Sequence, residues 1–206
     1  MKLGDDRKLG TLIFNPFLYV AGARALFIGI AAILLAGWIG SWGNTHFDGV
    51  LDAHSGAPAP LWLFPSEGMI DWFCLGIVLL IAGRMISKTP FRTIDVLGTQ
   101  AMARWPAVLL GLIALPPAVR RFGNYLLDQL LKPESKAELN VADAIIFSAV
   151  VAATIVVLCW MVALMYRAYS VSCNVKGGRA IGTFIAGILV AEILSKTALY
   201  WLLKLI

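Results

Sequence analysis

The chain has 206 residues, of which 60% are hydrophobic and 14% are charged, and its formal net charge is +5. Soluble domains carry about 25% charged residues, so this composition excludes an ordinary soluble protein. The lysines and arginines are dispersed at the ends of apolar segments, where lipid head groups would meet them, so the positive charge does not indicate nucleic-acid binding.

Several apolar segments are long enough to cross a bilayer, which takes about 20 helical residues. We predict an all-α integral membrane protein in which a short cytoplasmic tail, residues 1–15, precedes a single five-transmembrane-helix bundle, residues 16–206. The first helix is expected to begin at Asn15 and Pro16, which are typical of a helix start, and to stay in the mature protein as a signal anchor. The predicted spans are residues 21–42, 69–87, 95–115, 141–169 and 179–205.

Residues 119–132, between the third and fourth spans, are too polar to cross the membrane. Polar side chains recur there at every fourth position, whereas phenylalanine and leucine occupy another face; the polar set is Arg120, Asn124, Asp128 and Lys132. This pattern predicts an amphipathic helix that lies in the membrane interface. Asn140 then predicts the N-cap of the fourth span.

The distribution of basic residues indicates how the spans are oriented. If the chain has five spans and its N-terminus lies inside, most of the 17 lysines and arginines fall on the inner side, and the first outer connection, residues 43–68, has none. Positive charge marks the cytoplasmic side, so we predict a cytoplasmic N-terminus and an external C-terminus. The four bases between the third and fourth spans oppose this assignment.

Ionisable residues inside the spans are costly and therefore point to pairing or function. Arg104 and Glu192 are predicted at similar depths in the third and fifth spans, so we expect them to pair, with Gln100 completing the contact. The pair would serve as a clasp of the bundle or as part of a proton or ion path. Snorkelling of Arg104 toward one face is a further alternative.

Two other charged residues lie toward the outer side. Lys196 is one helical turn beyond Glu192, which favours an ion pair between them. Asp71 enters the second span at a similar depth, and we expect Lys196 to contact Asp71 or Glu67 beside the outer connection.

The outer connection also contains the only cluster of residues with metal-ligand chemistry. Two imidazoles and two carboxylates occur within ten residues, namely His46, Asp48, Asp52 and His54. These groups suit zinc or another divalent ion. The alternative is a solvated acidic loop without any cofactor, in which Phe47, Val50 and Leu51 dip into the membrane interface.

Two segments carry a family resemblance: IDVLGTQAMARWP at residues 94–106 and WMVALMYRAYSVSCNVKGGRAIGTFIAGILVAEILSK at residues 160–196. Together they resemble the Yip family, small membrane proteins of the Ypt/Rab-interacting type with bacterial members. The resemblance implies five spans with a cytoplasmic amino end. Eukaryotic members use a long acidic arm before the first span, but only about fourteen residues precede Asn15 here, so Rab binding is not carried over.

The sequence therefore predicts a Yip-type protein of the bacterial inner membrane with an interaction or organising role. Its expected partners are the lipid bilayer together with other proteins or further copies of itself, and not nucleic acid. A small ion or solute transporter or channel using Arg104 and Glu192 is the main alternative. A metal-dependent membrane enzyme using the outer histidines and aspartates is a third.

Overall fold

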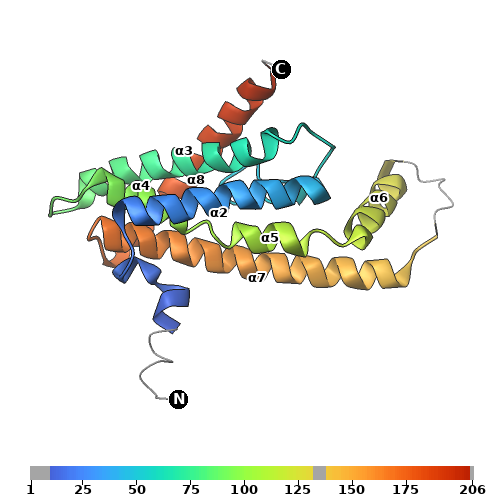
Figure 1. Cartoon of the computed structure of the whole chain (residues 1–206), viewed down its shortest axis with the longest axis horizontal. Coiled ribbons are helices and arrows are strands. Elements are labelled where there is room, and N and C mark those ends of the chain that lie inside the picture. The colour runs from blue at the N-terminus through green and yellow to red at the C-terminus, as the bar shows by residue number, and fades with distance from the viewer. Residues whose placement is uncertain (1–9, 132–137, 205–206) are drawn as a thin grey trace.

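Helices make up most of this computed structural model, which describes residues 10–131 and 138–204, and most of them follow one long direction (Figure 1). A short helix at residues 10–14 precedes the labelled elements. These are η1 (Pro16–Leu18), α2 (Gly22–Gly43), β1 (Thr45–His46), β2 (His54–Ser55), α3 (Leu63–Ile86), α4 (Thr93–Met102), α5 (Ala107–Ile113), α6 (Pro117–Leu131), α7 (Val141–Ser172) and α8 (Gly177–Lys204).

Five helical stretches are long and apolar enough to cross a membrane. They are Gly22–Gly43, Leu63–Ile86, Thr93–Ile113, Val141–Ser172 and Gly177–Lys204. The prediction of an all-α, multi-pass membrane protein with five spans is therefore confirmed by helix length and composition. The ends of the predicted tail and of the last span, residues 1–9 and 205–206, lie outside the described residues.

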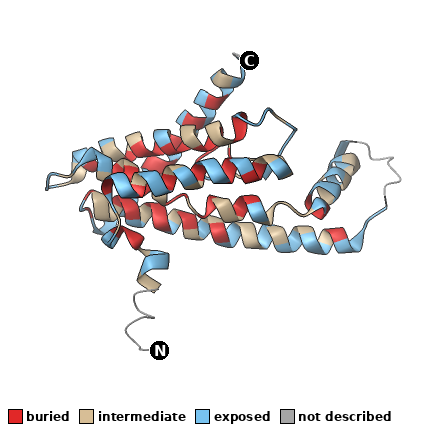
Figure 2. Ribbon diagram, viewed as in Figure 1, coloured by how far each residue is buried: buried red, intermediate tan, exposed pale blue. Residues whose placement is uncertain are grey.

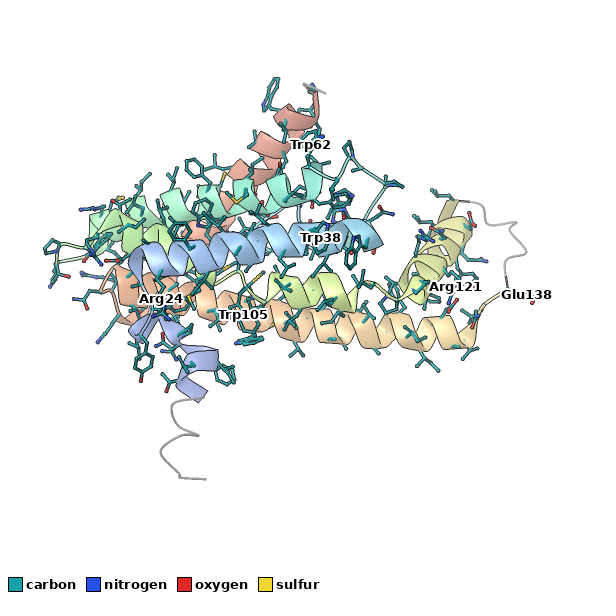
Figure 3. The ribbon with its side chains drawn as sticks, in the orientation of Figure 1. Arg24, Trp38, Trp62, Trp105, Arg121 and Glu138 are labelled. Atoms are coloured by element: carbon teal, nitrogen blue, oxygen red, sulfur yellow. The ribbon has the colours of Figure 1, made fainter. Side chains whose placement is uncertain are left out.

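The start of the first helix differs from the prediction. Asn15 makes no side-chain capping hydrogen bond, and Pro16 opens only the 3₁₀ turn η1. The spanning helix α2 begins afterwards at Gly22, whose positive φ of 61° suits glycine. Arg24 and Trp38 lie toward opposite ends of α2, as expected for residues at the two interfaces (Figure 3).

The second span begins earlier than predicted, at Leu63 instead of residue 69. Pro65 falls in the first turn of α3, where proline is tolerated because the first N–H groups have no partner within the helix. The earlier start moves Glu67 from the outer connection into the helix, where it is buried. The remaining connection forms a short antiparallel ribbon that pairs Thr45 with Ser55 and His46 with His54.

The third span is not the continuous helix predicted over residues 95–115. It is interrupted between Met102 and Ala107, where residues 103–106 form a turn. Pro106 provides the physical reason, because proline lacks an N–H and its ring collides with the preceding helical turn. The prediction of a continuous span overlooked the effect of Pro106.

The amphipathic segment forms α6, which runs from Pro117 to Leu131 and lies beside the first part of α7 at one end of the molecule (Figure 1). Its position in the membrane interface remains a prediction, and Lys132 lies outside the described residues. Asn140 caps α7 as predicted, because its Oδ1 accepts hydrogen bonds from the N–H groups of Ala142 and Asp143 at 3.0 and 3.3 Å.

The main cluster of buried apolar side chains lies where α3, the third span, α7 and α8 meet (Figure 2). In the most apolar 18-residue window of each span, the share of residues that are buried is 61% for the third span, 28% for α8 and 11% for α7. The close approach of α2 and α4 depends on two glycines, because a Cβ at Gly29 would overlap the backbone of Ala101 and one at Gly98 would overlap the backbone of Gly22. Lipid-facing surfaces of α7 and α8 explain why their apolar side chains stay exposed.

Candidate functional site

The break in the third span places Arg104 inside the bundle. Its side chain is 4% exposed, and its Nη1 lies 3.5 Å from Oδ2 of Asp71 on α3, which is fully buried. Its Nη2 donates a hydrogen bond of 3.3 Å to the carbonyl of Val50 in the outer connection. The arginine therefore joins the broken span to α3 and to a loop that reaches into the bundle.

Asp71 retains unused hydrogen-bonding capacity. Neither of its carboxyl oxygens has a hydrogen-bond partner among the described residues, and the same is true of Nε of Arg104. The two side chains thus form an ion pair without the bidentate hydrogen bonding that makes arginine–carboxylate pairs strongest. Buried acceptors with no donor are unusual and mark this centre as a candidate functional site.

The predicted direct pair between Arg104 and Glu192 is wrong. One carboxyl oxygen of Glu192 accepts a hydrogen bond of 3.2 Å from the N–H of Leu51, and the other lies 3.5 Å from Nζ of Lys196. Val50 and Leu51 are neighbours in the chain, so the outer connection bridges the two charged residues: its carbonyl binds the arginine and its next N–H binds the glutamate. Depth along two helices predicted proximity but not the loop that lies between them.

Gln100 also has a different role from the one predicted. Its Nε2 donates a hydrogen bond of 3.0 Å to the carbonyl of Met165 on α7, and its side chain is fully buried. It therefore ties α4 to α7 and does not complete the contact of Arg104. The hydroxyl groups of Thr99 and Ser172, 2.8 Å apart, tie the same two helices together.

Lys196 contacts Glu192 as predicted, and it also reaches the outer connection. Its Nζ lies 2.6 Å from Oδ2 of Asp52, so the predicted location beside the loop is right but the predicted partners, Asp71 and Glu67, are not. Burial by itself would raise the pKa of Asp52, but the hydrogen bond and charge of Lys196 outweigh it and hold that pKa below its ordinary value of 3.8. The contact fastens α8 to the loop.

Three of the four predicted metal ligands converge. Each of Asp48, Asp52 and His54 offers one ligand atom within 4.8 Å of the others, and Nδ1 of His54 lies 3.3 and 3.5 Å from the two carboxylates. One imidazole and two carboxylates suit zinc, which also binds water in its fourth position at catalytic sites. Lys196 competes with a metal ion for Asp52 because its ammonium already contacts that carboxylate.

His46 does not belong to this cluster, which corrects the predicted set. Its Nδ1 lies 2.7 Å from Oε1 of Glu67, and its Nε2 lies 2.9 Å from the carbonyl of Ala57. Because both ring nitrogens face oxygen acceptors, the protonated imidazole, which donates from both, fits the site best. The hydrogen bond with Glu67 raises the pKa of His46 above its ordinary value of 6.5, although burial acts in the opposite direction.

The role of Glu67 in anchoring the outer connection was not predicted. Besides His46, it accepts a hydrogen bond of 3.0 Å from the N–H of Phe47, so one carboxylate anchors the start of the outer connection. A signal was available, because Glu67 precedes Asp71 by one helical turn and both fall on the buried face of α3.

No protein-family model, curated protein or solved structure matches this chain. The two segments that carry the Yip resemblance do pack together, since Gln100 in residues 94–106 binds the carbonyl of Met165 in residues 160–196.

Proposed function

We propose that this chain is a Yip-type membrane protein with an interaction or organising role, in which the buried charges hold the bundle and its outer loop together. The observation that carries this proposal is the set of loop contacts. Arg104 of the third span and Glu192 and Lys196 of α8 each bind a residue of the outer connection. Glu67 adds a fourth attachment at the start of the same loop.

The surface of α7 supports the interaction role. This helix is 32 residues long, yet only 11% of its most apolar window is buried within the chain. Val156 and Ile145 are 69% and 65% exposed, whereas Leu164 on the same helix is fully buried. An apolar surface of this length suits lipid, other membrane proteins or a second copy of the chain.

Site-specific photocrosslinking in native membranes tests the proposal. A photoreactive residue at position 145 or 156 should give discrete protein adducts that mass spectrometry identifies, and one at the buried position 164 is the matched control. Lipid adducts alone at both exposed positions would contradict an organising role through α7.

The proposed location is the bacterial inner membrane, with the N-terminus in the cytoplasm and the C-terminus outside. It is supported by the outer connection, residues 43–68, which has no lysine or arginine. Alkaline phosphatase fused after Ile206 should be active, because this enzyme folds outside the cytoplasm. An inactive fusion at normal expression would contradict the orientation.

A small transporter is the second candidate, and the broken third span favours it. Discontinuous spans occur in transporters where irregular backbone lines a substrate or ion site near the middle of the membrane. Here the break carries Arg104, and Asp71 opposite it has unpaired acceptors. A proton or cation is the species that such a carboxyl group would take up.

Proton flux into liposomes distinguishes this candidate. Transport should be lost in Asp71→Asn and reduced in Glu192→Gln, while Asp95→Asn, which removes a carboxylate paired with the exposed Arg92, should leave it unchanged. Equal flux in all variants and in empty liposomes would eliminate the transporter.

A further inference from the structure

A groove of about 770 Å³ lies between α6, α7 and the ribbon of the outer connection. One wall comes from α6, with Leu126, Leu127 and Leu130, and the opposite wall from α7, with Phe147 and Val151. The ribbon residues 53–57 and the end of α5 close the groove at the first turns of α6. Its volume lies within the range of about 300–1,000 Å³ typical of ligand sites.

The position of α6 is fixed by specific contacts, so the groove is a built feature. Arg121 forms a bidentate ion pair with Asp143 at the start of α7, with N–O distances of 2.7 and 2.6 Å (Figure 3). The rings of Phe122 and Phe147 pack with their centres 5.0 Å apart. These contacts hold one side of α6 against α7 and leave the leucines of its other side facing the groove.

The groove combines this apolar lining with polar groups on the first half of α6. Arg120 and Asn124 lie one helical turn apart and line the groove together with Ser55 of the ribbon. No ion pair involves Arg120 within residues 10–131 and 138–204, so its guanidinium is free to bind an anion. The second half of α6 contributes only apolar side chains, of which Leu127 is 55% and Leu130 is 77% exposed.

We propose that this groove binds an anionic phospholipid of the surrounding bilayer, with an acyl chain along the leucines and the phosphate at Arg120. Guanidinium groups pair with phosphate through charge-assisted hydrogen bonds, and an amphipathic helix at an interface presents its apolar side to acyl chains. The arginine and the leucines of one groove thus match the two ends of a single lipid molecule. This inference does not depend on the organising role proposed above.

Gly123 gives a direct way to fill the groove. It lines the groove, and a Cβ built there has no heavy atom within 4 Å, so Gly123→Leu adds a side chain without a clash. Gly182 on α8 is the matched control, because it is also helical and free of neighbours within 4 Å but does not line the groove. Arg120→Gln removes only the charge.

The experiment is native mass spectrometry of the detergent-purified protein with phosphatidylglycerol or phosphatidylcholine of identical acyl chains. We expect one phosphatidylglycerol to be retained by the wild type and by Gly182→Leu. Affinity should fall about tenfold in Arg120→Gln, the effect of losing a hydrogen bond to a charged group, and binding should be lost in Gly123→Leu. Equal retention of the two lipids, or unchanged binding in Gly123→Leu, would overturn the proposal.

A second measurement uses the unaltered protein and so does not depend on how a variant folds. Phosphatidylglycerol with a photoreactive acyl chain should label peptides of α6 and α7 in liposomes, in competition with unlabelled phosphatidylglycerol. Labelling confined to other helices, or a dimer seated on α6 in the absence of lipid, would contradict lipid as the occupant.

Discussion

Replacing Arg104 with methionine removes the positive partner of a carboxyl group that has no contact with solvent. The side chains of Arg104 and Asp71 are 4% and 0% exposed, so neither charge can be solvated when the other is lost. Breaking a buried pair from one side costs about 3–5 kcal/mol, and the lost hydrogen bond to Val50 adds about 1 kcal/mol. We therefore expect Arg104→Met to lower the free energy of unfolding by about 4 kcal/mol or more.

Replacing both partners gives the informative comparison. In Arg104→Met/Asp71→Leu no buried charge is left unpaired, and apolar replacements of buried pairs are often close to neutral. We expect the double variant to be more stable than either single variant by about 2 kcal/mol. Unfolding in detergent, followed by the fluorescence of the seven tryptophans, measures all three free energies.

Glu192→Gln serves as the matched control for the choice of partner. Because the outer connection lies between Glu192 and Arg104, their coupling should be smaller than that between Asp71 and Arg104. The assigned pair would be refuted if Arg104→Met/Asp71→Leu lost as much unfolding free energy as its two single variants together. A larger coupling of Arg104 with Glu192 than with Asp71 would also refute it.

Three further predictions concern helix packing, pH and metal. Gly29→Leu should lower the unfolding free energy by about 1–3 kcal/mol, because it forces α2 away from α4. Gly182→Leu, the control, should change it by less than about 0.5 kcal/mol. Similar effects of the two variants would contradict the close packing of α2 and α4. The folded-state pKa of His46 is raised above 6.5, so its stabilising contribution is complete below pH 6.5 and is lost as the pH rises through the raised value. The melting temperature should therefore fall over that range in the wild type but less in His46→Gln. Lys196→Met should increase zinc affinity several-fold in calorimetric titration, because it frees Asp52 to bind the metal. Adding His54→Ala should abolish this gain. No change of zinc affinity in either variant would argue against a metal site.

The spans could be predicted because their signal lies in local composition. A run of apolar residues sets the length of a helix in lipid whatever its neighbours are, so five spans followed from the sequence. The break at Pro106 had a local signal too, but the surrounding apolar run concealed it. Local chemistry also identified Asn140 as a cap.

The partners of the charged residues could not be predicted in the same way. Residue number gives depth along a helix, but it does not give the direction in which a side chain points or the path of a loop. Asp71 and Arg104 were both recognised as intramembrane charges, yet their pairing depends on how α3 faces the third span. Val50 is buried in the bundle, although it was expected to reach only the membrane interface, and neither its contact with Arg104 nor that of Leu51 with Glu192 could be predicted from the sequence.

The low apolarity of the third span has a consequence for how the protein is made. Its mean hydropathy, 1.3, is the lowest of the five spans, and an arginine at a helix centre opposes insertion by about 2.5–3.5 kcal/mol. Such a segment has little drive to leave the translocation channel for lipid by itself. Because Asp71 on α3 pairs with Arg104, we expect the third segment to enter the bilayer together with the preceding spans and not alone.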